Sequence, residues 1–280
     1  MKLHEYLEIC ASKNQPLSEA AAESEAREQK CPKADIINEM SARFDIMRQS
    51  VERGMSSSAP SHSGLCGYNT ALMKNADAPP LLGNTGKKAM LYALAVAEEN
   101  ARMGKIVAAP TAGACGILPG VILAVGEELN IGRDKLVMSL FTAGAVGQAI
   151  AENATIAGAE GGCQAECGSA GAMAAAAAAE LSGGTAEMCV HAAALALKFT
   201  MGLVCDPVGG LVEIPCVKRN ASGAVNALAA ANLALSGITS AIPADEVIDA
   251  MGKVGKSLPH ELRETSKGGL AVTPTALKMR

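Results

Sequence analysis

Hydrophobic residues recur along this chain at the three- and four-residue spacing of α-helices. In the polar first part of the chain, one such stripe consists of Ile37, Met40, Phe44, Met47 and Val51. This stripe predicts an amphipathic helix. We expect Gly54 to end that helix, because glycine readily adopts the left-handed conformation found at helix C-termini.

From residue 85 onward, helix signals dominate. Helices are predicted over residues 85–103, 117–129, 134–152, 169–181, 185–201, 219–235 and 244–254. Thr185 is expected to cap its helix, because a hydroxyl accepts a hydrogen bond from the unpaired amides of the first turn. Strand signals are weak, since β-branched runs are short and period-two alternation is absent. The predicted fold class is therefore all-α, with site residues on Gly/Pro-rich loops between the helices.

A serine-rich segment, Ser-Ser-Ser-Ala-Pro-Ser-His-Ser-Gly at residues 56–64, follows the first predicted helix. Its composition is that of a loop. It serves either as a linker or as a site loop rich in hydroxyl groups. We divide the chain into an N-terminal helical segment, residues 1–54, and a main domain, residues 55–280.

Composition narrows the possible functions. Of the 280 residues, 49% are hydrophobic, whereas only 2% are aromatic and none is Trp. Such a chain can bury a sizeable core, and that core must pack small side chains between closely spaced helices. The net charge of −4 provides no basic surface for nucleic acid.

Two uncharged stretches, residues 106–126 and 221–241, are long enough to span a bilayer. Pro110 and Pro119 interrupt the first, and the second contains Asn226 among several polar residues. We interpret both as buried elements and expect no membrane association.

The nine cysteines are an odd number with irregular spacing, which does not indicate a disulfide framework. No secretory signal opens the chain. We therefore expect a cytoplasmic protein with reduced thiols. Five cysteines are interpreted as small hydrophobic residues: Cys10, Cys31, Cys66, Cys115 and Cys189.

Two glycine-containing loops carry the other cysteines. The segment Glu-Gly-Gly-Cys-Gln-Ala-Glu-Cys at residues 160–167 contains Cys163 and Cys167. The segment Cys-Asp-Pro-Val-Gly-Gly-Leu-Val-Glu-Ile-Pro-Cys runs from Cys205 to Cys216. Thiolates on such loops are soft ligands whose backbone can wrap closely around a bulky inorganic centre. Spacing alone leaves both a zinc site and an iron–sulfur cluster open.

Several segments, in the same order, carry a family resemblance. They are Ala-Pro-Thr-Ala-Gly (109–113), Gly-Gly-Cys-Gln-Ala-Glu (161–166), Cys-Asp-Pro-Val (205–208), Glu-Ile-Pro-Cys-Val-Lys-Arg-Asn (213–220), Leu-Arg-Glu-Thr (262–265), Gly-Gly-Leu (268–270) and Thr-Pro-Thr (273–275). From about Ser56 to the C-terminus, the chain resembles the alpha subunit of iron–sulfur-dependent L-serine dehydratases. The resemblance makes residues 55–280 the catalytic domain.

The resemblance implies a lyase that converts L-serine to pyruvate and ammonia on a [4Fe-4S] cluster. It assigns three cluster ligands, Cys163, Cys205 and Cys216, and does not select Cys167. One iron then lacks a protein ligand and acts as a Lewis acid on the substrate hydroxyl. Relatives pair this part with a beta part, either fused or as a separate subunit, so a beta-subunit partner is implied.

Residues near the matched cysteines are candidates for substrate contacts. Lys218 and Arg219 form a cationic pair suited to a substrate carboxylate, and Lys218 is also a candidate for the catalytic base. Asn220 follows them as a further substrate-binding candidate. Thr111 lies near amides that suit an anion, and Asn153 either orients substrate or closes its helix.

The serine-rich loop supplies the remaining candidates, Ser61, Ser63 and Gly64. His62 in the same loop is interpreted as a solvent-exposed bystander. Relatives typically have Gly-Gly-Asp where this chain has Gly-Tyr-Asn at residues 67–69. We expect this departure to alter substrate choice if the loop lines the site; the alternative is a loop at an interface or in solvent.

Two other functions remain open at this stage. One is a related cluster-dependent β-elimination on another small amino acid, such as cysteine. The other is a redox-sensing protein in which the cluster is not catalytic.

Overall fold

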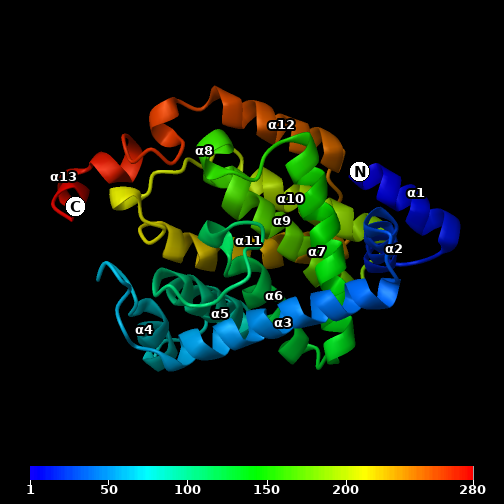
Figure 1. The fold of residues 1–280 in the computed structure, drawn as a ribbon, viewed down its shortest axis with the longest axis horizontal. Coiled ribbons are helices and arrows are strands. Elements are labelled where there is room, and N and C mark those ends of the chain that lie inside the picture. Colours follow the sequence, from blue (N-terminus) through cyan, green and yellow to red (C-terminus); the bar gives the residue numbers. More distant parts are fainter. Residues whose placement is uncertain (280) are drawn as a thin grey trace.

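The computed structural model describes residues 1–279 and confirms the predicted all-α fold (Figure 1). The helices are α1 (Leu3–Lys13), α2 (Leu17–Gln29), α3 (Lys33–Ser56), α4 (Asn69–Asn75), α5 (Gly83–Ala101), α6 (Ile117–Glu128), α7 (Arg133–Asn153), α8 (Gly158–Gly161), α9 (Ser169–Leu181), α10 (Ala186–Thr200), α11 (Cys216–Leu235), α12 (Ala244–Ser257) and α13 (Pro274–Leu277). Short η segments interrupt the connecting loops. They are η1 (Ala112–Ala114), the π-helical η2 (Gln164–Gly168), η3 (Val208–Gly210), η4 (His260–Leu262) and η5 (Gly269–Val272).

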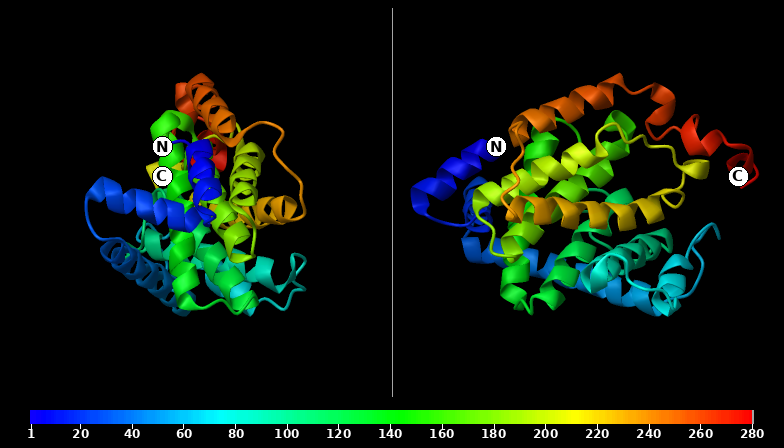
Figure 2. Two further views of the ribbon diagram at one scale, coloured as in Figure 1. Left: turned by 90° about the vertical axis from the view of Figure 1, so that its right-hand side faces the viewer. Right: turned by 180° about the vertical axis from the view of Figure 1, so that it is seen from behind.

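Helix α9 occupies the middle of the molecule and packs against α6, α7, α10 and α11 (Figures 1 and 2). Every residue of this helix from Ser169 to Ala179 is buried. Its alanine run makes a strong helix former, and its narrow surface lets four neighbouring helices approach closely. The expected core of small side chains is therefore present.

Glycines mark the closest approaches between helices. A Cβ atom at Gly54 of α3 would lie 2.1 Å from the carbonyl oxygen of Ala95 in α5, and one at Gly116 would lie 2.2 Å from that of Ala93. The prediction that Gly54 ends α3 was wrong, because α3 continues to Ser56. Gly54 instead provides the space that α5 occupies.

Most predicted helix boundaries agree with the structure to within a few residues. The Thr185 cap is confirmed, since its side chain accepts a hydrogen bond from the amide of Met188 at 3.3 Å. The helix predicted from residue 219 begins three residues earlier, at Cys216. Thus Cys216 is the first residue of α11 and not part of a free loop.

The N-terminal helices share the main hydrophobic core with the rest of the chain. Leu3, Leu17 and Phe44 belong to the same cluster of buried side chains as Ile117 and Ile150. The division of the chain after residue 54 stays a prediction.

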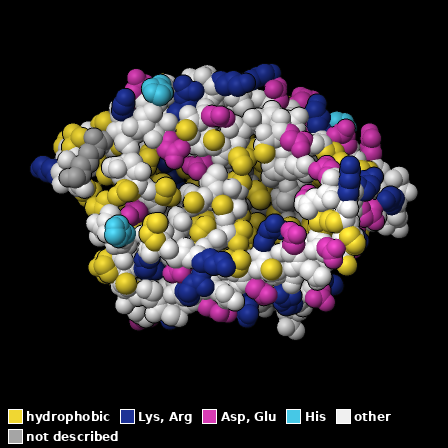
Figure 3. All heavy atoms as spheres, viewed as in Figure 1, with side chains coloured by type: hydrophobic (Ala, Val, Ile, Leu, Met, Phe, Trp, Pro, Cys, Tyr) yellow, Lys and Arg dark blue, Asp and Glu magenta, His cyan; other side chains and the backbone are white. Residues whose placement is uncertain are grey.

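Among residues 1–279, no helix combines the length and the apolar character needed to cross a membrane. Residues 106–126 form η1 and most of α6 instead, and residues 221–241 belong largely to α11. In the space-filling view, hydrophobic side chains gather across the middle of one face, with charged side chains above and below them (Figure 3).

Candidate active site

The first cysteine pair lies where α8 turns into the π-helical segment η2. Gly162, with φ of 74°, makes the turn, and Cys163 follows it. Gln164 fixes this turn, because its side chain accepts a hydrogen bond from the amide of Gly202 at 2.9 Å and donates to the carbonyl of Met251 at 3.1 Å. The sulfurs of Cys163 and Cys167 lie 3.3 Å apart, and both residues are buried.

The second cysteine segment is anchored to the C-terminal part of the chain. The amide of Cys205 donates to the carbonyl of Leu262 at 2.9 Å, and its carbonyl accepts from the amide of Glu264 at 2.8 Å. The carboxylate of Asp206 accepts from the amide of Leu270 at 2.8 Å and pairs with Arg219 at 2.8 Å. Because Arg219 belongs to α11, this buried ion pair ties the Cys205 end of the segment to the helix that begins at Cys216.

The thiols of Cys163, Cys205 and Cys216 are buried and near enough to affect one another's ionisation. Burial raises the pKa of Cys216 to about 12, and negative charge at Cys163 adds to that effect. Burial and charge at Cys163 likewise raise the pKa of Cys205. The pKa of Cys163 is lowered, first by its hydrogen bond with Cys167 and also by the positive charge of Arg219. All three residues offer soft sulfur donors of the kind that metal centres and iron–sulfur clusters use.

Glu166 adds a carboxylate to this thiol group. It accepts a hydrogen bond from the hydroxyl of Thr111 at 2.7 Å, and its other oxygen lies 3.8 Å from the sulfur of Cys205. Burial raises its pKa. Glu166, Cys205 and Glu264 offer ligand atoms within 4.8 Å of one another. Neither glutamate is among the residues predicted from the sequence, although both lie within the matched segments.

The candidates on α11 have different surroundings. Lys218 is exposed, whereas the side chain of Arg219 is 16% exposed and donates to the carbonyl of Val204 at 3.0 Å. Arg219 also lines a cleft of about 460 Å³ together with Cys167. The amide of Asn220 is buried and bonded to the backbone, since it donates to Gly113 and Cys216 and accepts from Gly116. Asn220 therefore holds η1, which follows Thr111, against the start of α11.

The serine-rich loop lies beside the Cys205–Cys216 segment. The hydroxyls of Ser61 and Ser63 both donate to one carboxylate oxygen of Glu213, at 2.6 Å and 2.7 Å. Gly64, with φ of 80°, makes the turn that follows. Glu213 is one of the two carboxylates near the ends of the Cys205–Cys216 segment. Its contact with the serines is not predictable from the sequence, because they lie about 150 residues away along the chain.

Asn153 bonds within its own helix, and His62 is exposed to solvent. The side chain of Asn153 donates to the carbonyl of Ala149 at 2.8 Å in the last turn of α7. His62 is exposed, as expected.

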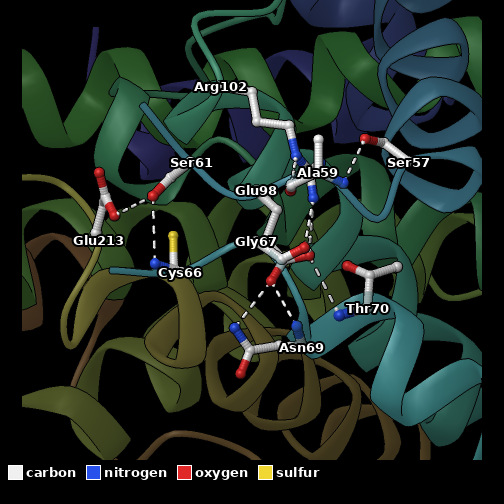
Figure 4. Close-up of polar contacts among 10 residues, drawn as sticks. All are labelled: Ser57, Ala59, Ser61, Cys66, Gly67, Asn69, Thr70, Glu98, Arg102 and Glu213. Atoms are coloured by element: carbon white, nitrogen blue, oxygen red, sulfur yellow. Dashed lines mark hydrogen bonds and ion pairs between the residues drawn. The ribbon is translucent and has the colours of Figure 1, made fainter. Parts of the chain in front are cut away.

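A charge pair at the C-terminal end of α5 contacts the serine-rich loop and the residues that follow it (Figure 4). Glu98, which is fully buried, accepts hydrogen bonds from the amide and the side chain of Asn69 at 2.7 Å and 2.8 Å. Arg102 lies 3.5 Å from Glu98 and donates to the carbonyls of Ala59 and Gly67. Tyr68, the other residue that departs from the family pattern, is 49% exposed.

Replacing Asn69 by Asp should destabilise the protein. The change removes the side-chain donor to Glu98 and places a second carboxylate against a buried one, with an expected loss of about 1–3 kcal/mol in unfolding free energy. Protonation of the introduced carboxyl removes the repulsion, so the difference should shrink as the pH falls. Thermal unfolding at neutral and acidic pH measures it, with Asn75→Asp at the exposed end of α4 as the control. Equal stability of Asn69→Asp and the parent protein at neutral pH would contradict this contact.

Comparison with known families decides the family. A family model described as the serine dehydratase alpha chain matches residues 12–271. The chain belongs to this family. The three cysteines, Arg219 and the serine-rich loop are thus features of a serine dehydratase alpha-type chain.

Relatives with a similar length cover nearly the whole serine dehydratase alpha-type chain. It is 47% identical to the probable L-serine dehydratase alpha chain of Bacillus subtilis, over 98% of this chain and 92% of that protein. It is 42% identical to the L-serine dehydratase alpha chain of Peptoniphilus asaccharolyticus, over 99% and 95%. It is also 38% identical to L-serine dehydratase TdcG of Escherichia coli, but there the match covers 86% of this chain and only 55% of that longer protein.

Proposed function

We propose that this chain is the catalytic alpha subunit of an L-serine dehydratase that converts L-serine to pyruvate and ammonia. The observation that carries the proposal is that three buried thiols, from Cys163, Cys205 and Cys216, lie near enough to affect one another's ionisation in a serine dehydratase alpha-type chain. Its relatives of the same length are named for this activity.

The three thiolates would hold a [4Fe-4S] cluster. When bound, such a cluster with one iron free of protein ligands supplies Lewis acidity for the departure of a hydroxyl group. Nine free cysteines, six of them outside the proposed ligand set, agree with a reducing compartment such as the cytoplasm.

The residues around the thiols bind and orient the substrate in this proposal. Arg219 supplies a fixed cation for the substrate carboxylate, because its ion pair with Asp206 and its bond to Val204 hold its side chain in place. Lys218 is exposed next to it and either contributes to the same anion site or accepts the α-proton. Ser61, Ser63 and Gly64 form a second wall, and Thr111 supports Glu166 beside Cys205.

We propose a beta subunit as the partner. The alpha chains of Bacillus and Peptoniphilus have about the length of this chain, whereas the single-chain relatives named L-serine dehydratase are about twice as long. The additional part of the longer proteins corresponds to what a separate beta subunit would supply.

Pyruvate formation from L-serine, measured on anaerobically purified protein with and without its partner, tests the proposed function. We expect activity that follows iron content, and loss of activity after treatment with an iron chelator. L-Cysteine and L-threonine serve as competing substrates. Full turnover of L-serine after complete removal of iron would reject the proposed cluster. A preference for L-cysteine would make L-cysteine, and not L-serine, the proposed substrate.

A further inference from the structure

Glu213 is bonded to the two serines of the loop that is proposed to contact substrate. It is 6% exposed and lies three residues before Cys216, in the segment that joins two proposed ligands. One of its oxygens accepts the hydroxyl hydrogens of both Ser61 and Ser63 (Figure 4 shows the Ser61 contact). A single carboxylate thus joins the serine-rich loop to the Cys205–Cys216 segment.

The hydrogen bonds that the two serine hydroxyls already form determine which further bonds they can make. A hydroxyl has one hydrogen to donate and two lone pairs that accept. Both hydrogens are committed to Glu213, and one lone pair on each oxygen accepts from a loop amide: Cys66 bonds Ser61 at 3.2 Å, and Leu65 bonds Ser63 at 3.0 Å. The Ser61 hydroxyl is buried and is also in contact with the thiol of Cys66, which bonds Glu213 as well. The Ser63 hydroxyl, with its hydrogen donated to Glu213, can only accept a further hydrogen bond.

This arrangement suits a cation that donates hydrogen bonds. The Ser61 and Ser63 oxygens lie 3.3 Å apart, and the negative charge of Glu213 lies directly behind them. A substrate carboxylate would meet only lone pairs and a like charge there, whereas an ammonium group offers three donors and a positive charge.

Space for such a group lies next to Ser63. This residue lines a cleft of about 400 Å³ together with Leu65, Gly209, Leu211 and Met279, none of which has a charged side chain. The cleft lies between the serine loop and the segment that joins Cys205 to Cys216. The serine loop and the C-terminal segment lie on the same side of the molecule (Figures 1 and 2).

We propose that Ser63, positioned by Glu213 together with the buried Ser61, forms the subsite that binds the α-ammonium group of an amino-acid substrate. Glu213 is a positioning residue: it removes the donor capacity of both hydroxyls and supplies the negative charge that selects ammonium. This inference rests on the proposed function and extends it. It assigns residues to the α-ammonium group, which distinguishes an amino acid from the corresponding hydroxy acid.

The Glu213→Gln variant tests the subsite in the enzyme purified anaerobically with its partner. Gln has nearly the same size but no charge, and its amide hydrogens compete with the serine hydroxyls. We expect KM for L-serine to rise roughly ten- to a hundredfold, while kcat changes by only a few fold. Inhibition by 3-hydroxypropanoate, which has the carboxylate and the hydroxyl but no ammonium group, should be unchanged. Iron content should equal that of the parent protein.

Two further variants separate this role from a structural one. Glu127→Gln removes another carboxylate that accepts from a hydroxyl, that of Tyr92, and should leave both ligands unaffected. Ser63→Ala leaves Glu213 in place and should raise KM for L-serine selectively, to a smaller extent. If Glu213→Gln weakens both ligands equally, lowers iron content, or changes nothing, the ammonium subsite is wrong. If the parent protein neither binds nor converts L-serine, the proposed function fails first and the subsite with it.

Discussion

Replacing any one of Cys163, Cys205 and Cys216 by Ser is expected to abolish both the visible chromophore and L-serine turnover. A hydroxyl is a harder and more weakly acidic ligand than a thiol, so it binds iron in a sulfide cluster poorly. With only three proposed protein ligands, the loss of one leaves the cluster with two. Iron and acid-labile sulfide analysis of anaerobically purified variants, together with visible absorbance, measures the effect.

Cys167 and Cys189 provide the controls for this experiment. Cys189 is fully buried in the core, so Cys189→Ser tests the loss of a buried thiol away from the site. Cys167 lies 3.3 Å from Cys163, and Cys167→Ser should retain iron, since the family resemblance does not select it. Full iron content in a Cys163, Cys205 or Cys216 variant would remove that residue from the ligand set. Loss of iron in Cys167→Ser alone would transfer the assignment to Cys167.

Removing Arg219 should have the second-largest effect, on both stability and activity. The Arg219→Met variant leaves the Asp206 carboxylate, which is 4% exposed, without its cation. An unpaired buried charge of this kind costs about 3–5 kcal/mol in unfolding free energy. The substrate carboxylate would also lose its partner, which should lower kcat/KM by roughly ten- to a hundredfold. Calorimetric unfolding and steady-state kinetics measure the two effects separately.

The double variant Arg219→Met with Asp206→Asn tells the two roles apart. Neutralising Asp206 removes the buried charge, and an asparagine oxygen can still accept from the amide of Leu270. Stability should therefore return most of the way to that of the parent protein, whereas kcat/KM should stay low. Recovery of kcat/KM along with stability would show that Arg219 acts only through the fold.

Sequence patterns predicted the helices well where composition and periodicity agree. Helix α9 is an example, because its alanine run favours a helix in any surroundings and its bounds at Ser169 and Leu181 were predicted correctly. Gly54 was misjudged, because a glycine that admits a neighbouring helix and a glycine that ends a helix look alike in a single sequence. The sequence places the start of α11 too late, because Pro215 and Cys216 end a segment with the composition of a loop.

The site was predictable only where its residues lie close together in the sequence. The cysteine segments carry their chemistry in residue type and spacing. The bonds of Ser61 and Ser63 to Glu213 join positions about 150 residues apart, and no local pattern connects them. The same holds for Thr111 and Glu166, and for the Glu98 contact that fixes Asn69. In each case the fold creates the pairing.

The contact between Gly54 and Ala95 links helix spacing to the geometry of the candidate site. Glu98 lies about one turn beyond Ala95 in α5, and Arg102 directly follows the helix. Arg102 bonds the serine-rich loop at Ala59, and Glu98 bonds Asn69 beyond that loop. A single methyl group at residue 54 must push α5 away from α3, because the obstacle is a backbone carbonyl that cannot rotate aside. The loop would be carried along with α5, whereas Glu213 lies in the segment that precedes α11. The activity that remains after substitutions at residue 54 therefore measures how large a displacement between the two sides of the candidate site the reaction tolerates.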